Sequence, residues 1–252
     1  MRGTEIINLG DFNEDEARDK LLKLMVLAKN CHQQDIDTLE MHLQLIRQHI
    51  EHSSDEGVHT GILFDVEDDV AEIINDSNFR EDRVGLKATK CESLLRLVHK
   101  YLGKDDPNIE VILACNPFIP ADVLNDLIIS ESYWEEDGTQ QALARNRKDV
   151  WVLEQLAQSD QEMTRYEVAL NDATPASILE KLIQDIGQCD WRVEEIKFGE
   201  VSPYRGFIRW AVIQNQNTPQ STLEKVVAGK LPEIDPNVDS ILKTIAKAFL
   251  DK

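Results

Sequence analysis

Apolar residues recur along this chain at steps of three and four positions, the spacing that places side chains on one face of an α-helix. Leu39, Leu43, Ile46 and Ile50 form the clearest series. Residue types that favour helices are abundant, while glycine and proline are scarce. In the first part of the chain the pattern predicts four helices, over residues 14–30, 36–52, 65–76 and 86–102.

Polar residues and a glycine mark the ends of two of these helices. Asn13 or Asp11 can cap the start of the first helix, because a short polar side chain accepts a hydrogen bond from a free backbone N–H there. Gly103 follows the fourth helix and is suited to end it. We therefore expect residues 1–105 to form a small N-terminal helical region.

The second part of the chain repeats itself around an asparagine. In each of four segments a short apolar stretch ends at the asparagine, and a second stretch follows with leucine or valine at helical spacing. The pattern predicts one helix before each asparagine and another after it. The four asparagines are Asn116, Asn146, Asn171 and Asn215.

Two of the segments carry a further signal, Thr174-Pro175 and Thr218-Pro219, just after the asparagine. We expect the threonine to cap the next helix and the proline to take its first position, where a missing N–H costs nothing. The asparagine is expected to tolerate a left-handed backbone and to hydrogen-bond within its own loop.

These segments resemble the units of the leucine-rich repeat variant family, a HEAT-like group of helical repeats, over about residues 108–230. The Asn116-Pro117 step matches the family's Asn-Pro step, and Arg165 and Arg209 match its arginine, each six positions before its asparagine. The resemblance implies an all-α fold in which helices form a right-handed, α-solenoid-like stack. It implies no chemistry, and helical repeats mostly bind other macromolecules on extended faces.

The repeats are irregular. The segment around Asn146 lacks both the threonine and the proline, and successive asparagines are separated by 30, 25 and 44 residues. The longest gap holds an insertion near residues 184–205. We therefore expect residues 106–252 to form a short, irregular stack of helical repeats that follows the helical region of residues 1–105.

The chain is strongly acidic, and this narrows the choice of partners. Its 47 acidic and 27 basic residues give a net charge of −20, with −9 in residues 1–105 and −11 in residues 106–252. A field of this sign repels nucleic acids and anionic membranes. We expect neither as a direct partner, and favour another protein with a basic surface. For the acidity itself, ordinary solubility is the favoured explanation, and attraction of a basic partner or imitation of DNA phosphates is the alternative.

The four cysteines, Cys31, Cys91, Cys115 and Cys189, show no Cys-x-x-Cys spacing. They are expected to be buried free thiols in a reducing compartment. The N-terminal residues lack the basic and apolar stretches of a signal peptide, and no apolar run is long enough to span a bilayer. We expect a soluble, cytoplasmic protein.

No pattern in the sequence points to catalysis, and we expect no enzyme activity and no cofactor. The glycine-rich phosphate loops, the nucleophile elbow and the zinc-protease motif are all missing. His49 and His52 are three residues apart on one expected helix, close to His42, but no further ligand stands at a fixed spacing. Solvent-facing histidines and no metal site are therefore expected.

Aromatic residues in the irregular parts are the candidate binding residues. Trp134 lies in an acidic stretch, where a buried position is hard to explain, although its ring can instead cover a helix end. Trp151 and Trp210 stand at helical spacing and are expected in the core. The candidates for a partner-binding anchor, from the acidic stretch and the insertion, are Tyr133, Trp134, Glu135, Glu136, Trp191, Phe198 and Tyr204.

Three functions are compatible with these features. The favoured one is a non-enzymatic adaptor or scaffold that binds a protein through a helical-repeat surface. The second is an acidic inhibitor, a decoy that imitates DNA and occupies the groove of a nucleic-acid-binding protein. The third is a subunit that acts only within a larger assembly. The sequence does not indicate an oligomeric state.

Overall fold

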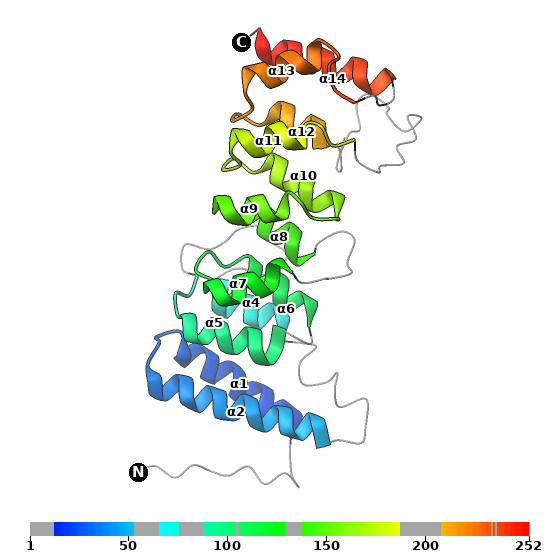
Figure 1. Ribbon diagram of the computed structural model, residues 1–252. Helices are drawn as coiled ribbons and strands as arrows, with labels where there is room; N and C mark the ends of the chain where they lie inside the picture. The colour runs from blue at the N-terminus through cyan, green and yellow to red at the C-terminus, as the bar shows by residue number, and fades with distance from the viewer. Residues whose placement is uncertain are drawn as a thin grey trace. The chain divides into compact units, whose positions relative to one another are not determined.

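The fold is known from a computed structural model, which describes most of the chain (Figure 1). Every regular element in this part is helical, which confirms the all-α prediction. None of the helices it contains combines the length and the apolar content needed to cross a membrane. The described residues are 13–52, 66–75, 88–103, 106–129, 138–186, 208–232, 234 and 236–251.

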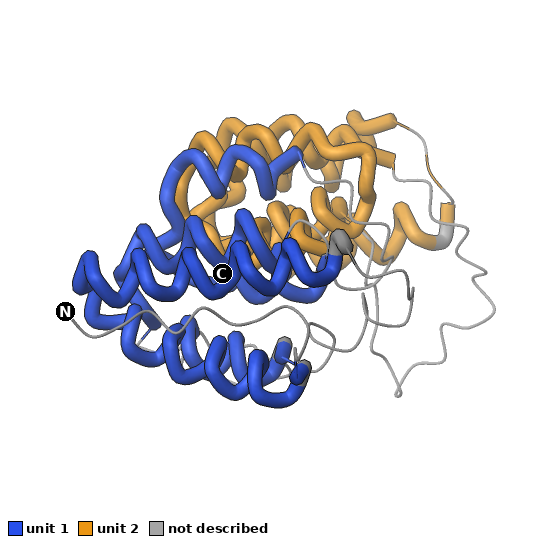
Figure 2. Tube along the Cα trace, turned by 90° about the horizontal axis from the view of Figure 1, so that it is seen from below, with its two compact units in different colours: residues 1–132 blue, residues 133–252 orange. Residues whose placement is uncertain are grey.

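The chain divides into two compact units, Met1–Ser132 and Tyr133–Lys252 (Figure 2). The expected division after residue 105 falls inside unit 1, where α6 packs on α4 and on the π-helical turn η2. The helices of unit 1 are α1 (Glu14–Ala28), α2 (Gln33–His52), α4 (Glu67–Asn75), α5 (Glu92–Val98), η2 (His99–Gly103), α6 (Pro107–Ala114) and α7 (Ala121–Ile128). Those of unit 2 are α8 (Thr139–Asn146), α9 (Val150–Leu156), α10 (Glu162–Leu170), α11 (Ala176–Leu182), α12 (Ile208–Gln214), α13 (Gln220–Val227) and α14 (Pro236–Leu250).

The core of unit 1 is made by the predicted apolar faces. α1 packs on α2 and on α4, α4 packs on α6, and α2 packs on α5 and η2. Leu39, Leu43 and Ile46 of α2 are buried, as the spacing of their side chains predicts. Asn13 caps α1, because its Oδ1 accepts a hydrogen bond of 3.2 Å from the backbone N–H of Glu16.

Unit 2 shows an alternating order of contacts along the chain. α8 contacts α10, α10 contacts α12, and α12 contacts α14, while α9, α11 and α13 each contact at least one helix of that series (Figure 1). The intervening helices bury side chains at equivalent positions. These are Val152, Leu153 and Leu156 in α9, Ile178, Leu179 and Leu182 in α11, and Thr222, Leu223 and Val226 in α13.

Three of the four predicted asparagines, Asn116, Asn171 and Asn215, are buried and join one turn to the next. Asn146 is only partly buried, and its Nδ2 donates to the carbonyl oxygen of Ala142 within α8. The Nδ2 amide of Asn171 donates to the carbonyl oxygens of Ala144, at 2.7 Å, and Arg147, at 2.8 Å. Its Oδ1 accepts a hydrogen bond of 2.9 Å from the backbone N–H of Ala173. The side chain therefore ties the end of α8 to the turn that follows α10.

Asn215 and Asn116 repeat this arrangement. Asn215 donates to the carbonyl oxygens of Ala169 and Asn171, both at 2.8 Å, and accepts from the N–H of Asn217. Asn116 accepts from the N–H of Phe118 at 2.8 Å and donates to an earlier turn of unit 1. We call these bonds the asparagine ladder.

The predicted bond within the asparagine's own loop is confirmed for Asn116, Asn171 and Asn215, but the predicted left-handed backbone is wrong. Asn171 has φ −63° and ψ 125°, an extended conformation. Within the described ranges, only Cys31 and Gly229 have positive φ. The extended backbone turns the asparagine side chain toward the preceding turn, where unsatisfied carbonyl oxygens need a donor.

The expected roles of Thr174 and Pro175 also need correction. Pro175 occupies the cap position of α11, and no side chain caps this helix. The Thr174 hydroxyl instead donates at 2.5 Å to the carbonyl oxygen of Val168, near the end of α10. Thr218 makes the same bond to Val212. Each threonine thus donates a hydrogen bond to a carbonyl oxygen near the end of one helix, rather than accepting one from an N–H at the start of the next helix.

A related contact lies in the N-terminal region, at an asparagine outside the four predicted ones; unlike Asn116, Asn171 and Asn215, its Oδ1 has no hydrogen-bond partner among the described residues. Asn75 ends α4, is buried, and donates at 2.6 Å to the carbonyl oxygen of Ile112. Asn116 donates in return to the carbonyl oxygens of Ile74, at 3.0 Å, and Thr89. A sequence signal was present, because apolar residues, Ile73 and Ile74, lie shortly before Asn75, as apolar residues also do before the other asparagines.

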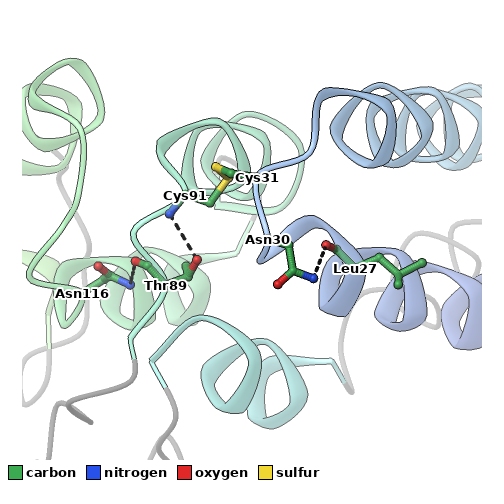
Figure 3. Close-up of a disulfide and its surroundings, with 6 residues drawn as sticks. All are labelled: Leu27, Asn30, Cys31, Thr89, Cys91 and Asn116. Carbon is green, nitrogen blue, oxygen red and sulfur yellow. Dashed lines mark hydrogen bonds between the residues drawn. A yellow bond between two sulfur atoms is a disulfide. The ribbon is translucent and has the colours of Figure 1, made fainter.

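The expectation of four free thiols is wrong. Cys31 and Cys91 form a disulfide, with their Cα atoms 5.4 Å apart, between the turn after α1 and the start of α5 (Figure 3). The two residues are 60 positions apart, so only the packing of unit 1 brings them together. Cys115 forms no disulfide among the described residues, and Cys189 lies outside them.

The expectation of solvent-facing histidines is wrong for His42 and His99, which are buried. The Nε2 of His42 lies 2.9 Å from the carbonyl oxygen of Ala17 and donates to it in the neutral ring. Its buried Nδ1 has no hydrogen-bond partner among the described residues. Burial lowers the pKa of His42, because a charged ring there would hold an unsatisfied N–H.

We predict that Asn171→Ala lowers the free energy of unfolding by roughly 2–4 kcal/mol, because two buried carbonyl oxygens and one N–H lose their partner. Asn171→Asp should cost more, since it turns a carboxylate toward those carbonyl oxygens. Gln155→Ala, on the exposed face of α9, is the control. Urea unfolding of the three variants measures the difference, and equal losses for Asn171→Ala and Gln155→Ala would contradict the ladder.

We predict that His42 makes the protein sensitive to acid. The unfolded state takes up a proton near the ordinary pKa of 6.5, whereas the folded state does so only at lower pH. Stability is therefore complete above that pH and falls below it, by at most about 1.4 kcal/mol per pH unit.

His42→Gln should remove this part of the acid sensitivity, because Gln carries no titrating group. Urea unfolding between pH 7 and pH 5 measures it, with the exposed His32→Gln as control. Parallel pH profiles for wild type and His42→Gln would contradict the prediction.

Candidate functional site

The residues predicted to bind a partner fall outside the part of the chain that the structure describes. Tyr133, Trp134, Glu135 and Glu136 lie within residues 130–137. Trp191, Phe198 and Tyr204 lie within residues 187–207. Their role stays a prediction, and the described residues present a different candidate on unit 2.

The candidate binding site on unit 2 includes the start of α9, where two large apolar side chains are exposed. Val150 is 53 % exposed and Trp151 is 44 % exposed. The equivalent pairs are Ala176 and Ser177 in α11, and Gln220 and Ser221 in α13. The other two helices therefore place small or polar side chains where α9 places a valine and a tryptophan.

The expected core position of Trp151 is wrong, and the spacing of the helix explains why. Val152, Leu153 and Leu156 define the buried face of α9. Trp151 instead shares its side of the helix with Glu154 and Gln155, three and four residues later, and both are exposed. Trp210 in α12 is partly exposed rather than fully buried.

A surface pocket of ≈ 360 Å³ lies between α9 and α11. Its apolar residues are Ala157, Ile178 and Leu182, two of which belong to the core. Ile186, 58 % exposed, follows the last lining residue in the sequence. The polar and charged residues that line the pocket are Glu154, Gln158, Lys181, Gln184 and Asp185.

Ion pairs hold the charged residues of this pocket. Lys181 lies 3.8 Å from Glu154, which links the two helices at the surface. Asp185 accepts a hydrogen bond of 2.7 Å from Nε of Arg165, and both side chains are largely buried. The backbone carbonyl of Asp185 accepts from Nε of Arg209 at 3.1 Å.

Arg165 and Arg209, which match the arginine of the resembled family, therefore meet at one residue, Asp185. Arg209 is almost fully buried and also donates to the carbonyl oxygen of Pro232 at 3.0 Å. Burial lowers the pKa of Arg209, while Asp239 and Asp185 act in the opposite direction. The two arginines fix the segment after α11, which forms one side of the pocket.

The acidic excess is uneven among the described residues. Those of unit 1 include 17 acidic and 8 basic residues, whereas those of unit 2 include 11 acidic and 10 basic residues. A negative field over the described helices therefore arises mainly from unit 1. The charged residues that line the pocket between α9 and α11 are Glu154, Asp185 and Lys181.

The structure brings together no obvious metal site in the ranges it describes. No group of three or more His, Cys, Asp or Glu side chains there is arranged to hold a metal ion. His49 lies in α2, and the side chain of His52 lies outside what is described.

Comparisons with known proteins add no relative. No family model, no curated protein and no solved structure matches the chain. The resemblance to leucine-rich repeat variants therefore rests on the residues of the repeats themselves and stays a prediction.

We predict that Trp151→Ser changes the free energy of unfolding by less than about 1 kcal/mol, because the exposed ring adds little to the core. Leu153→Ala, two positions later and fully buried, should cost about 2–5 kcal/mol through the cavity it leaves. Urea unfolding monitored by circular dichroism compares the two. A loss for Trp151→Ser as large as that for Leu153→Ala would show that Trp151 is a core residue.

Proposed function

We propose that this protein is a non-enzymatic binding module, an adaptor or scaffold that contacts another protein through a surface of helical repeats. The repeats are proposed to form an irregular right-handed stack of the leucine-rich repeat variant kind. The ordered helix contacts within each unit and the asparagine ladder support this architecture. A cytoplasmic location is part of the proposal, although the Cys31–Cys91 disulfide speaks against a permanently reduced chain.

The observation that carries the proposal is the exposed pair Val150 and Trp151. Tryptophan contributes strongly to protein–protein interfaces when a partner covers it and removes it from water. The pair stands at helix positions where α11 and α13 have small or polar residues, so the repeat pattern itself does not require it. A pocket with apolar side chains lies between α9, which carries this pair, and α11.

The partner we propose is a protein that combines an apolar anchor with basic residues. The apolar anchor suits the pocket and the ring of Trp151. The basic residues suit the acidic excess of unit 1, which attracts a cationic protein over several ångströms and raises its association rate. Affinity is expected to come mainly from the apolar contact.

One observation favours a second candidate, the acidic decoy of a nucleic-acid-binding protein. The described residues of unit 1 carry about twice as many acids as bases. A protein that imitates DNA phosphates must present such an excess to a basic groove. In this case unit 1 is the binding surface, and Trp151 has no part in it.

Affinity capture with matched variants tests the proposal. The full chain and its Val150→Ser/Trp151→Ser variant are used as baits in an extract of the native host, and recovered proteins are identified by mass spectrometry. A control bait carries Gln155→Ser on the same exposed face. We expect a partner that the wild type and the control recover and the double variant does not.

The affinity of the purified partner for this protein and its variants then decides between the two proposed functions, adaptor and decoy. For the adaptor, Val150→Ser/Trp151→Ser should weaken binding by at least about tenfold, the effect of losing one interface hot spot. Binding should change little between 50 and 300 mM salt, conditions chosen to span weak and strong screening. For the decoy, binding should fall steeply with salt and be unaffected by the double variant.

A further inference from the structure

The Cys31–Cys91 disulfide joins an exposed residue to a buried one. Cys31 is exposed in the turn after α1, while Cys91 is 2 % exposed and directly precedes α5 (Figure 3). A dissolved thiol can therefore reach the bridge from the side of Cys31. Access of this kind distinguishes disulfides that exchange in the folded state from those that open only on unfolding.

The backbone of Cys31 is held in an unfavourable conformation. Its φ of 57° lies in the left-handed region, which residues with a Cβ rarely adopt. The turn has one backbone bond at this residue, from the N–H of Cys31 to the carbonyl oxygen of Ala28 at 2.9 Å. The position holds no glycine, so the turn keeps a residue with a Cβ in a conformation that such residues rarely adopt.

Cys91, the second residue of the bridge, belongs to a segment that makes several hydrogen bonds, residues 89–91. The N–H of Thr89 donates to Ile74 at 2.8 Å, and the N–H of Cys91 donates to the Thr89 hydroxyl at 3.2 Å (Figure 3). Asn116 donates to the carbonyl oxygen of Thr89.

Next to this segment is an exposed aromatic ring. The ammonium group of Lys90 lies 4.8 Å from the ring centre of Phe118, which is 38 % exposed. The segment thus connects the disulfide to the asparagine ladder and to the Phe118 surface.

The helix pair α1–α2 keeps other attachments when the bridge opens. Lys100 and Tyr101 of η2 contact Glu40 of α2, at 3.0 Å and 3.2 Å, and Gln44 donates to the hydroxyl of Tyr101 at 3.2 Å. α2 also packs on α5 and η2. Reduction is therefore expected to loosen the two bridged segments without separating the helices.

We propose that the Cys31–Cys91 disulfide is a redox switch that opens in the folded protein and controls the order of residues 89–91 and of the Phe118 surface. A thiolate of a dithiol reductant attacks the Cys31 sulfur, and Cys91 leaves as a thiolate. The second thiol of the reductant attacks the mixed disulfide and releases Cys31. Two electrons pass to the protein, the reductant becomes a disulfide, and its two protons end on the cysteines.

The switch needs no particular partner, but its argument rests on the cytoplasmic location that is part of the proposed function. It fits a chain that works in a reducing compartment, where disulfides are mostly transient and used for sensing or catalysis. It adds a condition to any binding that involves unit 1, because the oxidised and reduced forms present different surfaces around Phe118.

Hydrogen exchange of the full-length protein tests the switch, with dithiothreitol as the dithiol and no denaturant. Thiol labelling and mass spectrometry follow the bridge. We expect it to open while the far-UV circular dichroism is kept, and the amides of Cys31, Thr89 and Cys91 to exchange at least about tenfold faster. Removal of the reductant under air should restore the slow exchange.

Two variants serve as references. Cys31→Ser/Cys91→Ser should show the fast exchange without reductant, and Cys115→Ser, at a cysteine outside the bridge, should behave as wild type. The switch is overturned if the bridge resists dithiothreitol until the protein unfolds. It is also overturned if exchange increases throughout both units, or if Cys31 is already labelled before reduction.

Discussion

The hydrogen bonds of the buried asparagines are the constraint on which the rest of this fold depends. A protein made of short helices has many helix ends, and each end leaves backbone carbonyl oxygens without a partner inside the helix. Burying such carbonyls without a donor is costly. Asn116, Asn171 and Asn215 meet this need, because each amide group donates to an earlier turn while its oxygen holds its own turn.

Turns that are held by side chains leave the outer helix faces free to vary. In α9, α11 and α13 the core needs only the few apolar positions that each helix buries, and these are equivalent in all three. The remaining positions carry no packing requirement, so a tryptophan at position 151 is tolerated where α11 and α13 have serine. The exposed ring of Trp151 is one of the features that support the proposed binding surface on unit 2.

Much of this architecture was predictable because it rests on local patterns. Spacing at three and four residues located the helices, Asn13 marked a start, and three of the four asparagines proved to be ladder residues. Asn75 was missed because no Thr-Pro step follows it and its partner turn is distant in sequence. Trp151 was misplaced because helical spacing alone does not fix which side of a helix is buried; Leu153 and Leu156 define the buried side of α9, and Trp151 lies beside it.

The disulfide could not have been predicted, since its two cysteines meet only after α1, α2 and α5 have packed. The effect of this disulfide depends on where it lies in unit 1. It enters the structure at residues 89–91, a segment that accepts a hydrogen bond from a ladder asparagine and lies next to an exposed ring. A disulfide placed in the middle of a helix face would stabilise the fold without further effect. A bond placed at a ladder contact connects the redox state of Cys31 to the turn that presents Phe118.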